Sequence, residues 1–117
     1  MSYQIEAHDE LLRRVPRVPS MLKELPDGTL TLTSAVFKTR PGEDGLSVDI
    51  LALTTMAQAV PNPATHTAAL LPAAVPMQEG YECRHNPVPG NNAHALIVGE
   101  VDKATSRRFA ASARLLL

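Results

Sequence analysis

Between Cys83 and Gly99 the chain reads Cys-Arg-His-Asn-Pro-Val-Pro-Gly-Asn-Asn-Ala-His-Ala-Leu-Ile-Val-Gly, and this stretch predicts two strands and the bend that joins them. Residues 81–85 alternate in polarity and contain strand-forming side chains, and residues 94–100 form a largely apolar run. Pro87 and Pro89 lack backbone donors, so a sheet ladder cannot continue through the segment between the two runs. The two strands are therefore expected to lie side by side, with a turn between them.

Two further strands are predicted in the first half of the chain. Residues 29–37 begin with an alternation of threonine and leucine, and β-branched threonine suits a pleated surface. The turn-forming segment at residues 40–45 predicts that residues 46–49 return as a second strand in a hairpin-like arrangement. With the two strands of the later stretch, these segments predict a small, mostly antiparallel sheet.

Two main helices are expected to pack on this sheet, which places the chain in the α+β class. Apolar residues recur at helical spacing between residues 50 and 60, with Asp49 as a plausible cap. Asp102 is placed to cap a second helix over residues 103–115. That last segment also alternates as a strand would, but its alanines favour the helix.

The remaining segments predict only short elements. Residues 1–8 are expected to form a loose lead-in, and residues 9–15 a short strand or a single helical turn that ends at a proline. A helix of one or two turns is predicted for residues 20–25 because Ser20 can cap it. Residues 64–71 are ambiguous and are interpreted as a short strand, with a possible helical turn at residues 72–75.

Length and composition limit the domain count and the class of protein. A chain of 117 residues fits one domain, residues 1–117, and its hydrophobic share of 44% is ordinary for a globular protein. The formal net charge of −1 argues against a nucleic-acid footprint over the whole surface. The absence of a long apolar segment and the single cysteine, Cys83, favour a cytoplasmic protein without a membrane span.

Histidine and cysteine side chains at the focal bend suggest a metal site or a nucleophile. On a strand over residues 81–85, Cys83 and His85 would lie on the same face, with their backbones separated by about 6–7 Å along the strand. A returning strand would bring His94 opposite, and a thiolate with two imidazoles suits zinc. This spacing is not a recognised zinc pattern, so a buried thiol and two hydrogen-bonded histidines are the stronger interpretation.

The same bend also suggests catalytic arrangements. Cys83 with a neighbouring histidine would need an oxyanion hole, and the Asn91-Asn92 amides are positioned in sequence to supply one. Ser34 or Ser47 with His94 and Asp49 also makes a combinatorial triad, although any chain of this length offers such triples. The catalytic candidates are His85, His94 and Cys83, and no reaction is specified by a motif.

Scattered short blocks are similar to a group of short bacterial proteins that carry no assigned function. The blocks are Arg13-Arg14, Ser34-Ala35-Val36-Phe37, Gly45-Leu46-Ser47-Val48-Asp49, His85-Asn86-Pro87 and Asn92-Ala93-His94-Ala95. The resemblance implies a bacterial origin and one small domain, and nothing about mechanism. An arginine near the first strand with later hydroxyls also loosely resembles the nicotinamide-nucleotide pockets of ADP-ribosyl transferases, but no glutamate stands in a catalytic motif of that family.

These blocks gather polar side chains that are predicted to line one surface cleft: Arg14, Ser34, Ser47, His85, Asn92 and His94. The favoured function is a small binding or interaction module that works with a larger protein partner. The alternative is a small enzyme, or a nucleotide- or metal-binding protein, that uses His85, His94 and Arg14. The sequence identifies no cofactor and leaves the oligomeric state open. The site hypothesis requires the two imidazoles to share one pocket.

Overall fold

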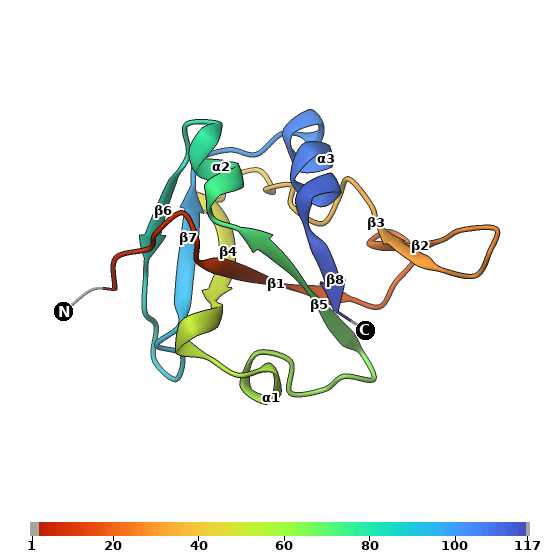
Figure 1. Ribbon diagram of the computed structural model, residues 1–117, viewed down its shortest axis with the longest axis horizontal. Helices are drawn as coiled ribbons and strands as arrows, with labels where there is room; N and C mark the ends of the chain where they lie inside the picture. The colour runs from red at the N-terminus through yellow and green to blue at the C-terminus, as the bar shows by residue number, and fades with distance from the viewer. Residues whose placement is uncertain (1–2, 117) are drawn as a thin grey trace.

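A six-stranded antiparallel sheet forms the centre of the computed structural model, which describes residues 3–116 (Figure 1). Its strands follow the order β6-β7-β4-β1-β5-β8. Their bounds are β1 (Glu10–Pro16), β4 (Gly45–Ile50), β5 (His66–Pro72), β6 (Glu82–His85), β7 (His94–Val98) and β8 (Arg114–Leu116). The predicted α+β class and the antiparallel sheet are confirmed, in a single domain.

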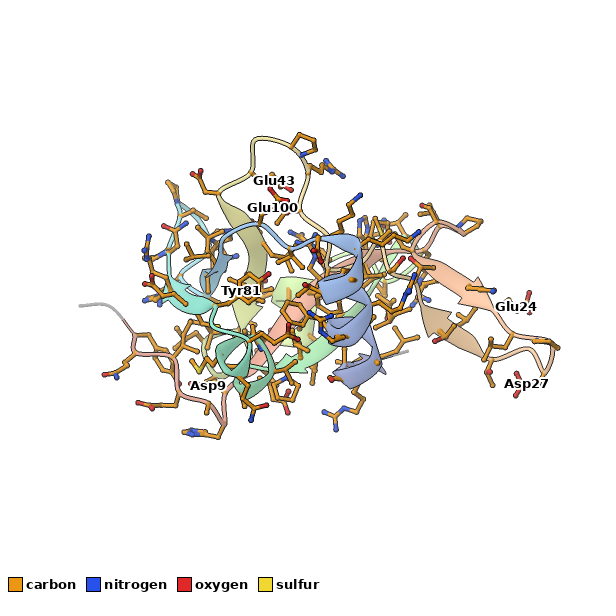
Figure 2. All side chains as sticks on the ribbon, turned by 90° about the horizontal axis from the view of Figure 1, so that it is seen from above. Asp9, Glu24, Asp27, Glu43, Tyr81 and Glu100 are labelled. Atoms are coloured by element: carbon orange, nitrogen blue, oxygen red, sulfur yellow. The ribbon has the colours of Figure 1, made fainter. Side chains whose placement is uncertain are left out.

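Two helices cover one face of this sheet, which is called the closed face below. α2 (Ala74–Gln78) and α3 (Lys103–Ser112) both lie at the top of Figure 1. The buried side chains beneath them include Leu11, Ile50, Ala69, Leu71, Ile97 and Phe109. Tyr81 and Phe109 meet edge to face with ring centroids 5.7 Å apart, and Tyr81 is labelled in Figure 2. This face is the main hydrophobic core.

The opposite face, called the open face, carries Arg14, Ser47, Asp49 and His94. Its membership follows from the register: Leu12 pairs with Asp49, and Asp49 pairs with His94. Side chains directly opposite each other in an antiparallel sheet share a face. A 3₁₀ turn at Leu51–Leu53 and α1 (Met56–Ala59) lie on this side, with a small apolar cluster formed by Leu12, Ala59, Val60, Ala68 and Leu70.

The predicted strand at residues 29–37 is wrong in both length and partner. Only β3 (Leu30–Leu32) is a strand, and it pairs with β2 (Leu22–Glu24) in a separate two-stranded sheet. This arm extends away from the main sheet at the right of Figure 1. Thr33 instead begins a tight turn, because its hydroxyl accepts a hydrogen bond from the Ala35 amide. The predicted helix at residues 20–25 is likewise replaced, by β2.

The strand predicted at residues 46–49 exists as β4, but its neighbours are not those expected. β4 lies between β1 and β7, so it makes no hairpin with residues 29–37. β1 and β5 are central strands paired along seven residues each, from Glu10 with Pro72 to Pro16 with His66. The sequence predicts a strand or a helical turn for residues 9–15 and a short strand for residues 64–71, but it does not predict that these strands lie in the middle of the sheet.

The two main helices predicted for residues 50–60 and 103–115 are not confirmed. Ile50 still belongs to β4, and the rest of the first segment divides into the 3₁₀ turn and α1, because the extended Thr54 and Thr55 separate them. The second helix, α3, is capped by Asp102 as expected, since the Asp102 carboxylate accepts a hydrogen bond from the Thr105 amide at 2.8 Å. It ends at Ser112, and β8 follows, so both interpretations of this segment were partly right.

Residues 3–9, the described part of the chain before β1, contain no helix or strand but pack against the sheet. Ile5 is buried in the main core. The buried Asp9 carboxylate accepts hydrogen bonds from the Tyr3 hydroxyl and the Glu6 amide. The part of the predicted loose lead-in that the structure describes is therefore tied to the core, while residues 1 and 2 lie outside the described residues.

Candidate functional site

A cleft of about 240 Å³ opens on the open face at the point where β1 and β4 diverge. The two strands pair only at Leu11–Ile50 and Leu12–Asp49, while β1 continues to Pro16 and β4 starts at Gly45. Polar and charged side chains from three strands, the loop before β4 and the bend between β6 and β7 line it: Arg13, Arg14, Arg40, Ser47, Asp49, Asn91 and His94. The splayed strands thus produce a concave polar site near the middle of the sheet.

Arg13 holds the diverging strands together at the base of the cleft. Its Nε donates to the Val36 carbonyl at 3.0 Å, and its Nη1 donates to the Ser47 carbonyl at 2.7 Å. Burial lowers the pKa of this guanidinium, although Glu43 opposes that effect. Arg13 therefore replaces ladder hydrogen bonds that the separated strands cannot make, and its role is largely structural.

Arg14 and Arg40 present exposed guanidinium groups to the same cleft. Neither side chain forms an ion pair or a hydrogen bond with any residue in the part of the chain that the structure describes. The nearest acid in sequence to Arg40 is Glu43, whose carboxylate accepts a hydrogen bond from the Arg40 backbone amide. Each of these two guanidinium groups can bind a carboxylate or a phosphate through two parallel hydrogen bonds.

Asp49 places a buried carboxylate in the floor of the cleft. It is about 9% exposed, and the Asn91 side-chain amide donates to its Oδ1 at 2.8 Å. The Asn91 carbonyl oxygen accepts from the Ala93 amide, and Asn91 and Val88 exchange backbone hydrogen bonds across the bend. Gly90 closes that bend with φ of 82°, in the left-handed region that glycine tolerates. The predicted turn therefore positions Asn91, which in turn orients Asp49.

His94 lies directly across from Asp49 on β7. The backbone hydrogen bond from Ile50 to Ala93 makes Asp49 and His94 a non-hydrogen-bonded cross-strand pair, the type in which side chains approach more closely. Nδ1 of His94 donates to the Asn86 carbonyl at 2.8 Å. In the neutral ring Nε2 is then an acceptor, and it has no hydrogen-bond partner among residues 3–116. His94 thus offers a free acceptor nitrogen beside Asp49.

His85 does not share this cleft, which contradicts the prediction that the two imidazoles meet. His85 pairs with Ala95, the residue after His94, and successive strand residues point to opposite faces. Both of its ring nitrogens are already used: Nδ1 accepts from the Tyr3 amide at 2.7 Å, and Nε2 donates to the Asn92 carbonyl at 2.6 Å. His85 is therefore a structural residue that ties the chain before β1 to the bend.

Cys83 also belongs to the closed face, where it packs against the main core. Burial raises the pKa of its thiol to about 11, and the charge of Glu82 acts in the same direction. A thiol with this pKa is protonated at neutral pH, so it is a poor nucleophile. Because His94 lies on the other face, the predicted zinc set of Cys83, His85 and His94 is not assembled. Among residues 3–116 no group of three histidine, cysteine or acidic side chains is placed to hold a metal ion.

The predicted serine arrangements are only partly realised. Ser47 lines the cleft with Asp49 and His94, but the His94 Nδ1 donates to Asn86 and not to the carboxylate, so the orienting step of a triad is missing. Ser34 lies elsewhere, in a surface hollow with Arg107 of α3. Of the residues predicted to share one cleft, the structure brings together Arg14, Ser47 and His94.

Asn92, the remaining predicted ligand-binding residue, lies in an adjoining cleft of about 580 Å³. That cleft is bounded by α1 on one side and by the bend at Gly90–Asn92 on the other. It shares Arg14, Asp49 and Asn91 with the first cleft. Asn92 therefore lies close to the predicted site, although its backbone carbonyl is taken by His85.

Sequence reasoning did not select Arg40 and Asn91 as ligand-binding residues, and it used Asp49 mainly as a helix cap. Asn91 was in the focal bend, but its part in orienting Asp49 depends on a contact across 42 positions in sequence. Arg40 was placed in a solvated turn, and only the splaying of β1 from β4 turns that loop toward the cleft. The one usable signal is that Asp49 and His94 lie on two strands predicted for the same sheet, but the sequence does not fix the register that places them opposite each other.

No protein-family model, curated protein or solved structure matches this chain. The similarity to short bacterial proteins therefore stays a prediction. Within residues 3–116 no helix has the length and apolar character that a membrane crossing requires.

Proposed function

We propose that the protein is a small cytoplasmic binding module whose open-face cleft holds an anionic group of a larger protein partner. The observation that carries the proposal is the pair of exposed guanidinium groups of Arg14 and Arg40, which line the cleft without an ion pair in the described chain. Guanidinium groups match carboxylates and phosphates in geometry as well as in charge.

The charge distribution supports an anionic ligand. Three arginines and one acid, Asp49, line the first cleft, although the chain as a whole has a formal net charge of −1. The exposed acids Glu24 and Asp27 lie far out on the β2–β3 arm (Figure 2), where they do not neutralise the cleft. A locally positive hollow attracts an anion even though the molecule as a whole is slightly negative.

A thermal-shift titration with inorganic phosphate and with citrate tests this proposal. Both anions should raise the melting temperature, because a ligand that binds only the folded chain stabilises it by RT ln(1 + [L]/Kd). Arg14→Gln should abolish the shift, whereas Arg107→Gln, which removes an exposed arginine from α3, should leave it unchanged. Absence of a shift, or an equal shift in Arg14→Gln, contradicts the proposal.

A small enzyme is the second candidate, and the state of His94 favours it. With Nδ1–H donated to the Asn86 carbonyl, the free Nε2 is oriented as a general base beside Asp49. Chromogenic carboxylate and phosphate esters provide the test. Catalysis is supported if the native protein turns over an ester and His94→Gln does not, while phosphate still shifts the melting temperature of the variant. Absence of turnover by the native protein contradicts this second candidate.

A further inference from the structure

The two clefts of the open face adjoin each other and are together called the groove below. Arg14, Asp49 and Asn91 line both clefts, so a ligand that extends beyond one of them meets the other at these three residues. At one end the groove reaches Pro16 and Met21, and at the other it reaches α1 and the bend at Gly90. A single small anion on Arg14 and Arg40 would fill only the first part.

The second part of the groove offers uncharged hydrogen-bonding groups. Gln58 and Asn92 are exposed, and their side-chain amides form no hydrogen bond with other residues between 3 and 116. Each amide carries both donors and an acceptor. A peptide backbone alternates the same two kinds of group, so an extended chain can pair with these side chains along its length.

The groove offers few aromatic surfaces on which a nucleobase can stack. Among residues 3–116, no phenylalanine or tyrosine lines either cleft, and the imidazole of His94 is the one aromatic ring there. The rings of Phe37, Tyr81 and Phe109 pack against one another on the closed side, and Tyr3 packs against His85. Base recognition in single strands and nucleotides relies strongly on aromatic stacking, so the lining favours a peptide over a nucleotide.

We infer that the groove binds an extended acidic segment of the partner's polypeptide chain, an inference that rests on the proposed function. One carboxylate or phosphate side chain of the segment lies between Arg14 and Arg40. The adjoining backbone follows the groove past Asn91 to Gln58 and Asn92. An extended segment of about nine residues, which rises about 3.3 Å per residue, is roughly 30 Å long, a length comparable with the 28 Å of the molecule's shortest axis.

Binding of random peptides of this length tests the inference. Peptides that bind the protein are first selected from an array, and their affinities are then measured by fluorescence anisotropy. Three sets carry glutamate, phosphoserine or glutamine at the central position, and AMP and ATP are titrated in parallel. Selected peptides should come from the two acidic sets, and the preferred set identifies the anionic group. Affinity should fall about tenfold or more in Arg14→Gln, because the variant loses the charge-assisted hydrogen bonds to the acidic group of the peptide.

The double variant Gln58→Ala/Asn92→Ala separates this inference from the proposed function. It should weaken the selected peptide several-fold and leave the thermal shift with inorganic phosphate unchanged. Gln78→Ala, an exposed glutamine at the end of α2, is the matched control and should change neither. Two outcomes would contradict the inference and leave the anion site intact, provided that phosphate binding depends on Arg14. In the first, the double variant binds the peptide as tightly as the native protein does. In the second, AMP or ATP binds more tightly than every peptide. If phosphate itself does not bind, both fail.

Discussion

The two faces of the sheet use the same kinds of residue in opposite ways. Arg13 donates to two backbone carbonyls, whereas its neighbour Arg14 has no partner in the described chain. His85 uses both ring nitrogens, whereas His94, nine positions later, keeps one free. Residue type alone therefore does not identify a site; what marks it is hydrogen-bonding capacity that the fold leaves unused.

The largest difference between the faces should be seen on truncating the closed-face core. Phe109 is fully buried and meets both Phe37 and Tyr81 edge to face. Phe109→Ala should lower the free energy of unfolding by about 3–5 kcal/mol, through lost burial and the cavity left behind. Urea denaturation followed by circular dichroism measures this, and a loss below about 1 kcal/mol would show that the closed face is not the main core.

The next largest effect concerns the reactivity of Cys83. Its pKa is raised to about 11, so at pH 8 only about 0.1% is thiolate, against roughly a quarter for an ordinary thiol with a pKa near 8.5. Iodoacetamide should therefore modify the native protein at least about a hundredfold more slowly than the chain in denaturing guanidinium chloride. The native rate should rise as the pH approaches 11. Native and denatured rates within tenfold of each other would contradict the assignment of Cys83 as inert.

A smaller effect is expected for Arg13, which contacts both the closed side and the cleft. Arg13→Gln removes the hydrogen bonds to Val36 and Ser47 where β1 and β4 separate. The free energy of unfolding should fall by about 1–3 kcal/mol, because the variant loses two hydrogen bonds from a charged donor, of which the one to Val36 is partly buried. Equilibrium denaturation measures it, and an unchanged stability would mean that the cleft does not depend on this side chain.

The smallest effect on stability is expected for Arg14, one residue further along. Arg14→Gln should change the free energy of unfolding by less than about 0.5 kcal/mol, because the exposed guanidinium makes no intramolecular bond to lose. The same denaturation experiment as for Arg13 gives the comparison. A loss as large as that of Arg13→Gln would assign Arg14 to the scaffold and remove the main support for the binding site.

The fold was predictable where local pattern and tertiary environment agree. Residues 82–85 and 94–98 are strands as expected, because prolines and Gly90 interrupt the sheet only between them. The prediction of one helix over residues 50–60 was wrong, although the apolar side chains recur at helical spacing. Ile50 is the last residue of a strand, and the other apolar residues are divided between the 3₁₀ turn and α1. The pairing predicted for residues 29–37 was wrong because alternation of polar and apolar residues identifies a strand but not its partner, which here is β2.

The site was predictable only in part for the same reason. Arg14, Ser47 and His94, which were predicted to share a cleft, do line one, since β1, β4 and β7 bring them to one face. His85 was expected beside His94 because both flank one bend, but the pairing of His85 with Ala95 places the two rings on opposite faces. A shift of one residue in register reverses the face of a side chain, and the bend sequence does not fix that register.

An amide-resolved NMR titration with inorganic phosphate tests the anion site most directly. The account predicts that the resonances of Arg14, Ser47, Asp49 and His94 shift in a saturable way, that those of α3 stay in place, and that Arg14→Gln removes the response. Shifts centred on Arg107 and α3, or an undiminished response in Arg14→Gln, would contradict it.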